Sequence, residues 1–276
     1  MQNLLIREAT IQDCEGIQSV HMGTPGPWAN INECIPWVSK RIERGYYVQV
    51  AEFDNQIVGH AEWVETHDPG GKFFYLCVMQ IKAEYQGQGI GMKMVEDGIR
   101  AAKEQGSAKV VTIPEEETGS EKFYAKCDFV DGRQIKSVAI PTGDFGYSQN
   151  YTEADSAPFE IIRERQFIFG LSQASARHMW ELYNKKPEGD NRVTTTLISD
   201  IGDCIQILNL SNNPHSAWVL YWSDAPKAGV VKDILTLGKA KGFKEIAFDF
   251  FSEYESFFSE FDNEIKAYCV ETYKLI

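Results

Sequence analysis

Runs of apolar residues in the first 140 positions predict a fold rich in β-strands. Alternating or short continuous runs predict strands over 3–8, 46–53, 56–64, 73–81, 108–113 and 132–140. Helical spacing predicts helices over 11–20, 32–44 and 92–104, and a short one around 120–127. Asp54-Asn55 separates two strand-like runs and is typical of a hairpin turn. The order predicts an α+β fold, with a mixed, mostly antiparallel twisted sheet flanked by helices.

A similar order of runs recurs after residue 150. It predicts helices over 172–184, 225–241 and 253–261, and strands over 193–199, 204–210, 217–222, 245–251 and 265–273. Residues 95–113 are similar in pattern to residues 231–249, and the two helices end at Gln105-Gly106 and Lys241-Gly242. We therefore predict a tandem repeat of two domains, 1–150 and 151–276. The strand-like run 159–169 could close the first sheet or begin the second.

Glycines cluster between the predicted strand 73–81 and the predicted helix 92–104. The cluster reads Gln86-Gly87-Gln88-Gly89-Ile90-Gly91, and glycine at such a corner lets main-chain N–H groups face an anion at the start of a helix. It lacks the third glycine of a dinucleotide-binding motif, because Met92 stands there, and it lacks the Gly-Lys-Ser/Thr ending of a P-loop. Neither of these nucleotide sites is expected.

Three residues of the cluster fit another motif. Gln86, Gly89 and Gly91 match the pattern (Gln/Arg)-x-x-Gly-x-(Gly/Ala), and the region resembles the fourth strand and third helix of the GNAT acyltransferase superfamily. The resemblance implies an acyl-CoA N-acyltransferase-like fold with acetyl-CoA as co-substrate. It also implies that the turn holds the coenzyme pyrophosphate and that main-chain groups of the fourth strand hold its pantetheine arm. The implied coenzyme-binding residues are Met79, Ile81, Gln86, Gly87, Gln88, Gly89, Ile90, Gly91 and Met92.

A second stretch resembles the same superfamily. Tyr124 and Phe129 are in register with its Tyr-x-x-x-Gly-Phe pattern, and the resemblance implies that Tyr124 protonates the departing thiolate. Asp128 stands where the superfamily usually has glycine. Glu117 and Ser120 replace a frequent asparagine and alanine.

The general base is harder to assign. Tyr75 occupies the fourth-strand position at which histone-type members carry a glutamate, so we take Glu62 as the catalytic candidate to relay the acceptor's proton. His60, Glu65 and His67 are further candidates, and strand alternation places His60 on the face of Glu62. All four could instead be solvated surface residues. Trp28 and Trp37 could wall the acceptor site or pack in a core.

Charge and cysteine usage restrict the partners. The chain has 27 basic and 40 acidic residues, a formal charge of −13, which disfavours nucleic acid and anionic membranes and mildly favours a cationic or neutral substrate. Its 6 cysteines show no zinc-like spacing, so we expect reduced thiols and no metal. No signal-like or membrane-spanning run is present, and we expect a cytoplasmic protein.

The second half lacks the coenzyme turn. Its corner, 223–229, contains Pro226, which has no N–H, and Asp224, which repels phosphate, while Phe257-Phe258 stand near the place of the tyrosine. We expect this half to do no chemistry and to pack against or cover the first. The function predicted is direct transfer of an acetyl group from acetyl-CoA to the amine of a small molecule or peptide. A non-catalytic acyl-CoA sensor, a hydroxyl or thiol acceptor, and a homodimer stay open.

Overall fold

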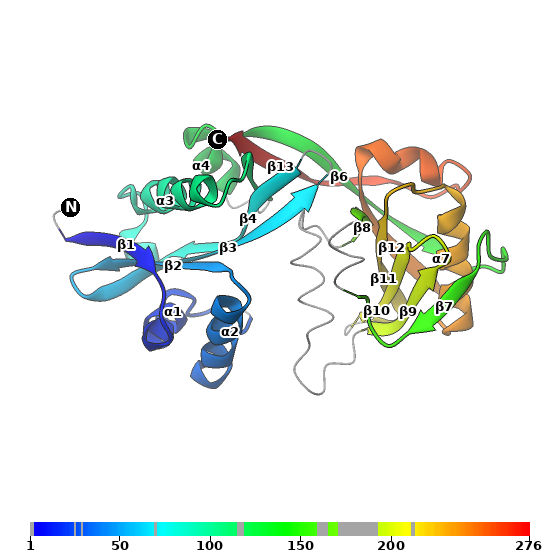
Figure 1. Ribbon diagram of the computed structural model, residues 1–276, viewed down its shortest axis with the longest axis horizontal. Helices are drawn as coiled ribbons and strands as arrows, with labels where there is room; N and C mark the ends of the chain where they lie inside the picture. The colour runs from blue at the N-terminus through cyan, green and yellow to red at the C-terminus, as the bar shows by residue number, and fades with distance from the viewer. Residues whose placement is uncertain are drawn as a thin grey trace.

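The computed structural model describes residues 3–24, 26–28, 30–68, 71–114, 119–158, 165–170, 193–210 and 213–276. Its described strands join in one 13-stranded sheet, in the order β1-β2-β3-β4-β5-β13-β6-β12-β8-β11-β10-β9-β7. The sheet spans two lobes (Figure 1). The strands are β1 (Leu4–Glu8), β2 (Tyr47–Phe53), β3 (Gln56–Asp68), β4 (Gly71–Ile81), β5 (Lys109–Thr112), β6 (Val130–Pro141), β7 (Tyr151–Ala154), β8 (Gln166–Phe169), β9 (Val193–Ser199), β10 (Cys204–Leu210), β11 (Asn213–Ser223), β12 (Glu245–Phe251) and β13 (Lys266–Leu275).

Helices cover both faces of the sheet in the N-terminal lobe. Helices α1 (Cys14–Val20) and α2 (Ile31–Glu43) lie on one face, while α3 (Ile90–Glu104) and α4 (Ser120–Lys126) lie on the other (Figure 1). Each face has its own apolar core. One contains Ile17, Val38 and Tyr75 under α1 and α2, and the other contains Trp63 and Met94 under α3. These layers confirm the predicted α+β class.

Local sequence signals explain most of the boundaries. Asp54 and Asn55 both have positive φ, +48° and +62°, as the hairpin between β2 and β3 requires. Thr10 and Asp13 form a capping box at the 3₁₀ helix η1 (Ile11–Asp13), which leads into α1. The Asn30 side chain caps α2 by accepting a hydrogen bond from the Glu33 N–H.

The predicted helices of the second half need correction. The helix predicted over 225–241 is α7 (Gly229–Ala240) and begins four positions late, because Pro226 and its neighbours form a turn. The segment predicted as a helix over 253–261 is the 3₁₀ helix η3 (Ser252–Phe258). The helix predicted over 172–184 lies outside the described residues.

Strand β8, at the end of the run 159–169, pairs with strands of the second half. It belongs to the second half, where Phe167 pairs with Trp222 of β11 and Phe169 pairs with both Tyr221 of β11 and Phe250 of β12. Earlier in both strands, β11 and β12 pair directly as parallel strands, from Ser216 with Glu245 to Trp218 with Ala247. Strand β8 therefore fills the space where the two parallel strands diverge.

The two halves also exchange strands at the centre of the sheet. Strand β13, the last of the chain, lies between β5 and β6 of the first half, while β6 lies between β13 and β12 of the second. Each half thus completes its sheet with a strand that pairs with the other half. This arrangement is absent from the sequence predictions, which placed residues 265–273 wholly in the second half.

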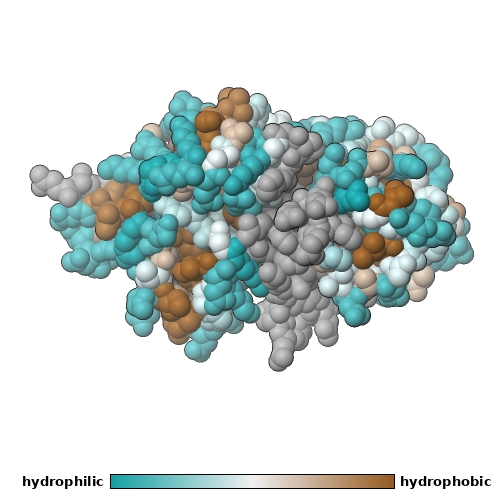
Figure 2. All heavy atoms as spheres, in the orientation of Figure 1, coloured by the Kyte–Doolittle hydropathy of each residue, from teal (hydrophilic) through white to brown (hydrophobic). Residues whose placement is uncertain are grey.

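The surface agrees with a fold that buries its apolar residues in cores. On the face shown in Figure 2, apolar side chains form small separate patches within a mostly hydrophilic surface. In the described part of the chain, no helix has the length and apolar character needed to cross a membrane.

Candidate functional site

The glycine stretch forms the corner between β4 and α3. It follows the 3₁₀ helix η2 (Ala83–Tyr85), and Gly87 and Gly89 have φ of +73° and +82°. Side chains brace the corner against this helix, since Gln86 Nε2 donates to the Ile81 carbonyl at 2.9 Å and Gln88 Nε2 donates to the Glu84 carbonyl at 3.1 Å. Positive φ explains why glycine stands at both positions.

The amides of this corner are available to a ligand. Within the described residues, the main-chain N–H groups of positions 87–92 donate no hydrogen bond, and the first bond of α3 runs from the Lys93 N–H to the Gly89 carbonyl. A Cβ added at Gly87 or Gly89 would point into open space. Exposed, unpaired donors at the positive end of a 15-residue helix suit a diphosphate.

Glycine stands at position 91 for a different structural reason. It lies in the first turn of α3, and a Cβ there would come within 3.1 Å of the Phe123 ring of α4. Its lack of a side chain therefore allows α4 to pack closely on α3. Ile90 is buried in the core under α3, while the Met92 side chain is exposed.

Strands β4 and β5 separate beside this corner. They pair from Phe73 with Lys109 to Tyr75 with Val111, and the last link is the Thr112 hydroxyl, which donates to the Leu76 carbonyl at 3.1 Å. Strand β4 continues to Ile81, and no described strand pairs with this extension on the β5 side. The result is a gap between parallel strands that ends at the glycine corner.

The main chain of β4 turns polar groups into this gap. The Lys82 N–H donates to the Val58 carbonyl on the β3 side, so alternation directs the main-chain groups of Ile81 and Met79 to the opposite side. The pairing register with β3 shifts beside Cys77, since Leu76 pairs with Trp63 and Val78 pairs with Glu62. Such a bulge bends the strand and increases its local twist, which favours divergence from β5.

Tyr124 lies in α4, buried among aromatic rings near the closed end of the gap. Its ring is 5.1 Å from Phe123 and 5.4 Å from Phe129, and its side chain hydrogen-bonds with Thr112. Burial raises the pKa of Tyr124 to about 12, with the Thr112 hydrogen bond acting in the opposite direction. The phenol is therefore protonated at neutral pH and can donate a proton.

Residues 20–129 match the model of the Acetyltransferase (GNAT) family. Residues 20–129 are a GNAT acetyltransferase domain. This confirms the predicted resemblance and the predicted enzyme class, an acyltransferase. No curated protein sequence matches the chain.

Solved structures share the fold of the whole chain, not only of the GNAT domain. A GCN5-related N-acetyltransferase from Anabaena variabilis has a TM-score of 0.69 and 9% identity over 99% of this chain and 72% of its own. A second, from Kribbella flavida, has a TM-score of 0.68 and 12% identity, and the match covers 99% of this chain and 71% of its own. A third, from Sphaerobacter thermophilus, has a TM-score of 0.52 and 12% identity, and the match covers 99% of this chain and 95% of its own. At such identities the likeness extends to the fold alone.

Glu62 lies on the α1 and α2 face of the GNAT domain, in β3 beside β4. Its carboxylate is fully buried, accepts a hydrogen bond from Trp37 Nε1 at 2.8 Å and lies 3.2 Å from the Arg41 Nε. Burial raises the pKa of Glu62, and the charge of Arg41 and the Trp37 hydrogen bond oppose that rise. Because both partners come from α2, Glu62 anchors this helix to the sheet, and its proton-relay role stays a prediction.

Two histidines extend this buried network. His60 shares the face of Glu62, as alternation predicted, and its Nδ1 lies 2.9 Å from Nε2 of His21. Burial lowers the pKa of His21 to about 4 and that of His60 well below its ordinary value. The His21 ring stacks on Trp28, with centroids 4.3 Å apart, so both rings are neutral packing partners at neutral pH.

The two tryptophans pack together in the core under α1 and α2, which was one of the two alternatives expected for them. Trp28 and Trp37 make an edge contact with centroids 6.0 Å apart, and the Arg41 guanidinium lies 4.1 Å from the Trp37 centroid. Sequence reasoning missed Arg41 and His21. The four-residue spacing of Trp37 and Arg41 on one helix was the only available signal for Arg41.

Glu65, another candidate base from the sequence, lies towards the surface. It forms an ion pair with Lys72 at 2.6 Å, and both side chains are partly exposed. The side chain of His67, the last of the four candidates, lies outside the described residues. In the described part of the chain, no group of three or more His, Cys, Asp or Glu side chains could hold a metal ion.

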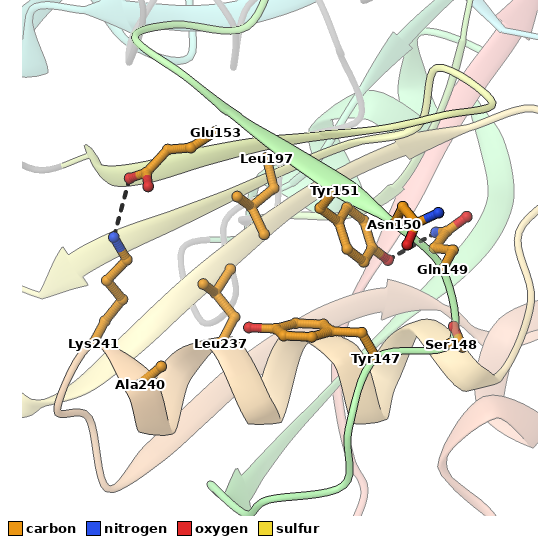
Figure 3. Close-up of a pocket in the computed structure, with 10 residues that line it drawn as sticks. All are labelled: Tyr147, Ser148, Gln149, Asn150, Tyr151, Glu153, Leu197, Leu237, Ala240 and Lys241. Atoms are coloured by element: carbon orange, nitrogen blue, oxygen red, sulfur yellow. Dashed lines mark hydrogen bonds and ion pairs between the residues drawn. The ribbon is translucent and has the colours of Figure 1, made fainter.

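A separate cavity of about 730 Å³ opens in the second half, between residues 147–153 and α7 (Figure 3). The Tyr147 ring lies along α7, and an ion pair between Lys241 and Glu153, 3.1 Å, closes one end. The cavity and the glycine corner belong to different lobes (Figure 1), so the cavity is not a part of the GNAT site.

Proposed function

We propose that the chain transfers the acetyl group of acetyl-CoA directly to an amine of a small molecule or peptide. One observation carries the proposal: unbonded main-chain donors at the start of α3 adjoin the open gap between β4 and β5. A diphosphate and the thioester arm attached to it need these two features side by side.

In this proposal the corner residues from Gln86 to Met92 hold the diphosphate. Gly87, Gln88, Gly89 and Ile90 would act through main-chain N–H groups, while the side chains of Gln86 and Gln88 keep the corner braced on η2. Gly91 contributes by close packing of α3 on α4. The corner itself contributes no cationic side chain, so affinity would come from oriented dipoles and the helix terminus.

The gap would orient the reacting thioester. Acetyl-CoA supplies an acetyl group activated by its thioester bond. Main-chain groups of Met79 and Ile81 point to the side of β5, and an N–H there would stabilise negative charge that develops on the thioester oxygen. Tyr124 would give its proton to the departing sulfur, since its raised pKa keeps it protonated at neutral pH.

The acceptor would approach from the α1 and α2 face. Holding an amine and the thioester together in one cleft supplies much of the rate, so no covalent enzyme intermediate is needed. The formal charge of −13 favours a cationic or neutral acceptor over an anionic one.

We also propose that the chain is divided near residue 150 into an acetyltransferase domain, 1–150, and a GNAT-like domain, 151–276, without a coenzyme site. Support comes from β8, which occupies the second gap, and from the corner before α7, where the N–H groups of Val230 and Val231 donate to Lys227 and Ala228 carbonyls. The N–H groups of Val230 and Val231 are therefore engaged, whereas those of positions 90–92 at the start of α3 donate no hydrogen bond within the described residues.

The direct test has two measurements. Calorimetric titration with acetyl-CoA should show one binding site, and a panel of primary amines should include at least one that releases free CoA thiol in the presence of the protein. Binding without thiol release for any amine would favour a sensor. An absence of binding would remove the basis of the proposal.

A further inference from the structure

The strand exchange places a carboxylate from the end of the chain beside the proposed transfer site. We propose that Glu271 of β13 binds an ammonium group of the acceptor other than the neutral amine that attacks the thioester, and that the acceptor is therefore a cationic amine. This inference rests on the proposed function, and it assigns to the C-terminal half a part in substrate recognition.

The pairing register places Glu271 at the level of the gap. Val111 of β5 pairs with Tyr75 on one side and with Tyr273 on the other, and Thr112 pairs with Thr272. Strand β5 ends at Thr112. Glu271 is one residue further along the antiparallel β13, at the level of Cys77, where β4 has already lost its pairing with β5.

Glu271 also lies on the face from which the acceptor would approach. Cys269 and Tyr273, two residues before and after it in β13, pack in the core under α1 and α2 together with Tyr75 and Cys77. The register slip between β13 and β6 at this point is an extra residue in β6, so alternation along β13 is preserved. Burial raises the pKa of Tyr75, and the nearby charge of Glu271 raises it further, which agrees with a short separation.

The carboxylate is buried and rigidly held. Glu271 is 3% exposed, its Oε1 accepts hydrogen bonds from the Nε of Arg133 at 2.9 Å and from the main-chain N–H of Arg133 at 3.3 Å, and its Oε2 accepts from Nη2 at 3.2 Å. The Arg133 guanidinium lies 3.6 Å from the centroid of the Phe251 ring. Because each carboxylate oxygen has two lone pairs, the bonds made within the described residues leave Oε2 able to accept another donor.

Close packing fixes the same side chain from β6. A Cβ added at Gly132 would lie 2.8 Å from Glu271 Cγ and 3.0 Å from Oε1. Glu62, another buried carboxylate on this face, lies in β3 and contacts Trp37 and Arg41 of α2. Glu271 Oε2 retains a lone pair for one of the three N–H donors of an incoming ammonium.

The test compares two acceptors in the full-length protein. Diaminopentane is a cationic alkylamine, and p-anisidine is an arylamine that is uncharged at neutral pH. In Glu271→Gln, kcat/KM for diaminopentane should fall about 10- to 100-fold, mainly through KM, because a charged hydrogen bond is lost. The value for p-anisidine and the affinity for acetyl-CoA should change less than about twofold, since neither depends on this charge.

Two further variants separate recognition from folding. Gly132→Ala leaves every charge in place but displaces the Glu271 side chain, so it should reproduce the selective loss. Glu255→Gln breaks the Lys136–Glu255 ion pair, 2.6 Å, which also joins β6 to the second half but away from the gap. It should leave both acceptors unaffected.

The outcomes distinguish this inference from the proposed function. Equal losses with both amines in Glu271→Gln, accompanied by a lower Tm, would mean that Glu271 is structural and would overturn the inference alone. Acetylation of p-anisidine but not of diaminopentane by the unmodified protein would do the same. Thiol release with neither of these amines nor with any amine of the panel would contradict the proposed function itself, and the role of Glu271 would fall with it.

Discussion

The two halves of the chain use the same strand order and differ where the parallel strands separate. In the first half β4 and β5 make three pairs and then diverge around a gap that no described strand fills. In the second half β11 and β12 also make three pairs, and β8 then enters between them. A single short strand therefore accounts for the difference between a half with an open gap and a half with a continuous sheet.

The corners after these strands differ in the same sense. At the first, positive-φ glycines leave the amides of 87–92 without acceptors in the described chain. At the second, Ala225 N–H donates to the Ser223 hydroxyl and Asp224 forms an ion pair with Arg165 at 2.5 Å. At the second corner the Ala225 N–H is therefore engaged within the turn, and the Asp224 carboxylate disfavours an anion.

In contrast to the corners, the helices that follow them, α3 and α7, share several features. Asp97 of α3 accepts a hydrogen bond from the Tyr47 hydroxyl, and Asp233 of α7 accepts one from the Tyr151 hydroxyl. Gly106 and Gly242 end the two helices with φ of +74° and +88°. These features of the scaffold are thus common to both halves, while the open strand gap and the glycine corner are features of the first.

The largest effect is expected from weakening the strand that fills the second gap. Phe169 of β8 is fully buried against Tyr221, Phe248 and Phe258. Phe169→Ala should lower the free energy of unfolding by about 3–5 kcal/mol, measured by urea denaturation, because it leaves a cavity. Acetyl-CoA affinity at the first half should not change. A second acetyl-CoA site in this variant would show that β8 alone suppresses binding.

The next effect concerns the tyrosine that the second half lacks. Tyr124→Phe should lower kcat about 100- to 1000-fold without weakening acetyl-CoA binding, because only the proton donor is lost. The matched control is Tyr151→Phe, which removes a half-buried hydroxyl bonded to Asp233 at 2.6 Å. It should cost about 1 kcal/mol of stability and leave turnover intact.

The pH profile provides an independent check on Tyr124. Since its pKa is raised to about 12, the tyrosine keeps its proton throughout the usual assay range. Turnover should rise with pH as the acceptor amine loses its proton, with no alkaline fall caused by Tyr124 below about pH 12. An alkaline fall near pH 10 that is lost in Tyr124→Phe would contradict the buried position of the phenol.

Substitution of Gly89 tests whether the corner binds acetyl-CoA. Gly89→Val should weaken acetyl-CoA binding about 10- to 100-fold by calorimetry, since the side chain enters the space before the amides and resists positive φ. Gly106→Val is the control, because Gly106 has a similar φ and equally open space around its Cβ position. Both should lose at least about 1 kcal/mol of stability. Equal effects on binding would mean that strain, not the cradle, is responsible.

The last prediction concerns the acid sensitivity of stability in the first half. Burial lowers the pKa of His21 to about 4. The unfolded chain therefore binds a proton at His21 near pH 6.5, whereas the folded chain does not. Stability should therefore be full above pH 6.5 and fall by about 2 kcal/mol between pH 6.5 and pH 5. In His21→Asn, a plot of Tm against pH should be flatter. An unchanged slope would assign the acid sensitivity elsewhere.

Local sequence patterns were sufficient to locate most of the elements and the first glycine corner. Apolar periodicity located most of the strands because each strand repeats the same local requirement, and Asp54-Asn55 fixed its hairpin through positive φ. Gly87 and Gly89 identified the corner for the same reason. Pro226 and Asp224 likewise showed that the second corner is different, since a missing N–H and a carboxylate are properties of single residues.

Tertiary structure alone decided which segments meet. The exchange of β6 and β13 and the insertion of β8 depend on pairing between residues far apart in the chain, and local pattern carries no information on the choice of partner. The same holds for Arg41 against Glu62 and for Glu271 against Arg133, where burial makes pairing necessary but does not name the partner. The end of the chain enters the first domain's sheet because β5 and β6 leave a place between them that only a paired strand can satisfy.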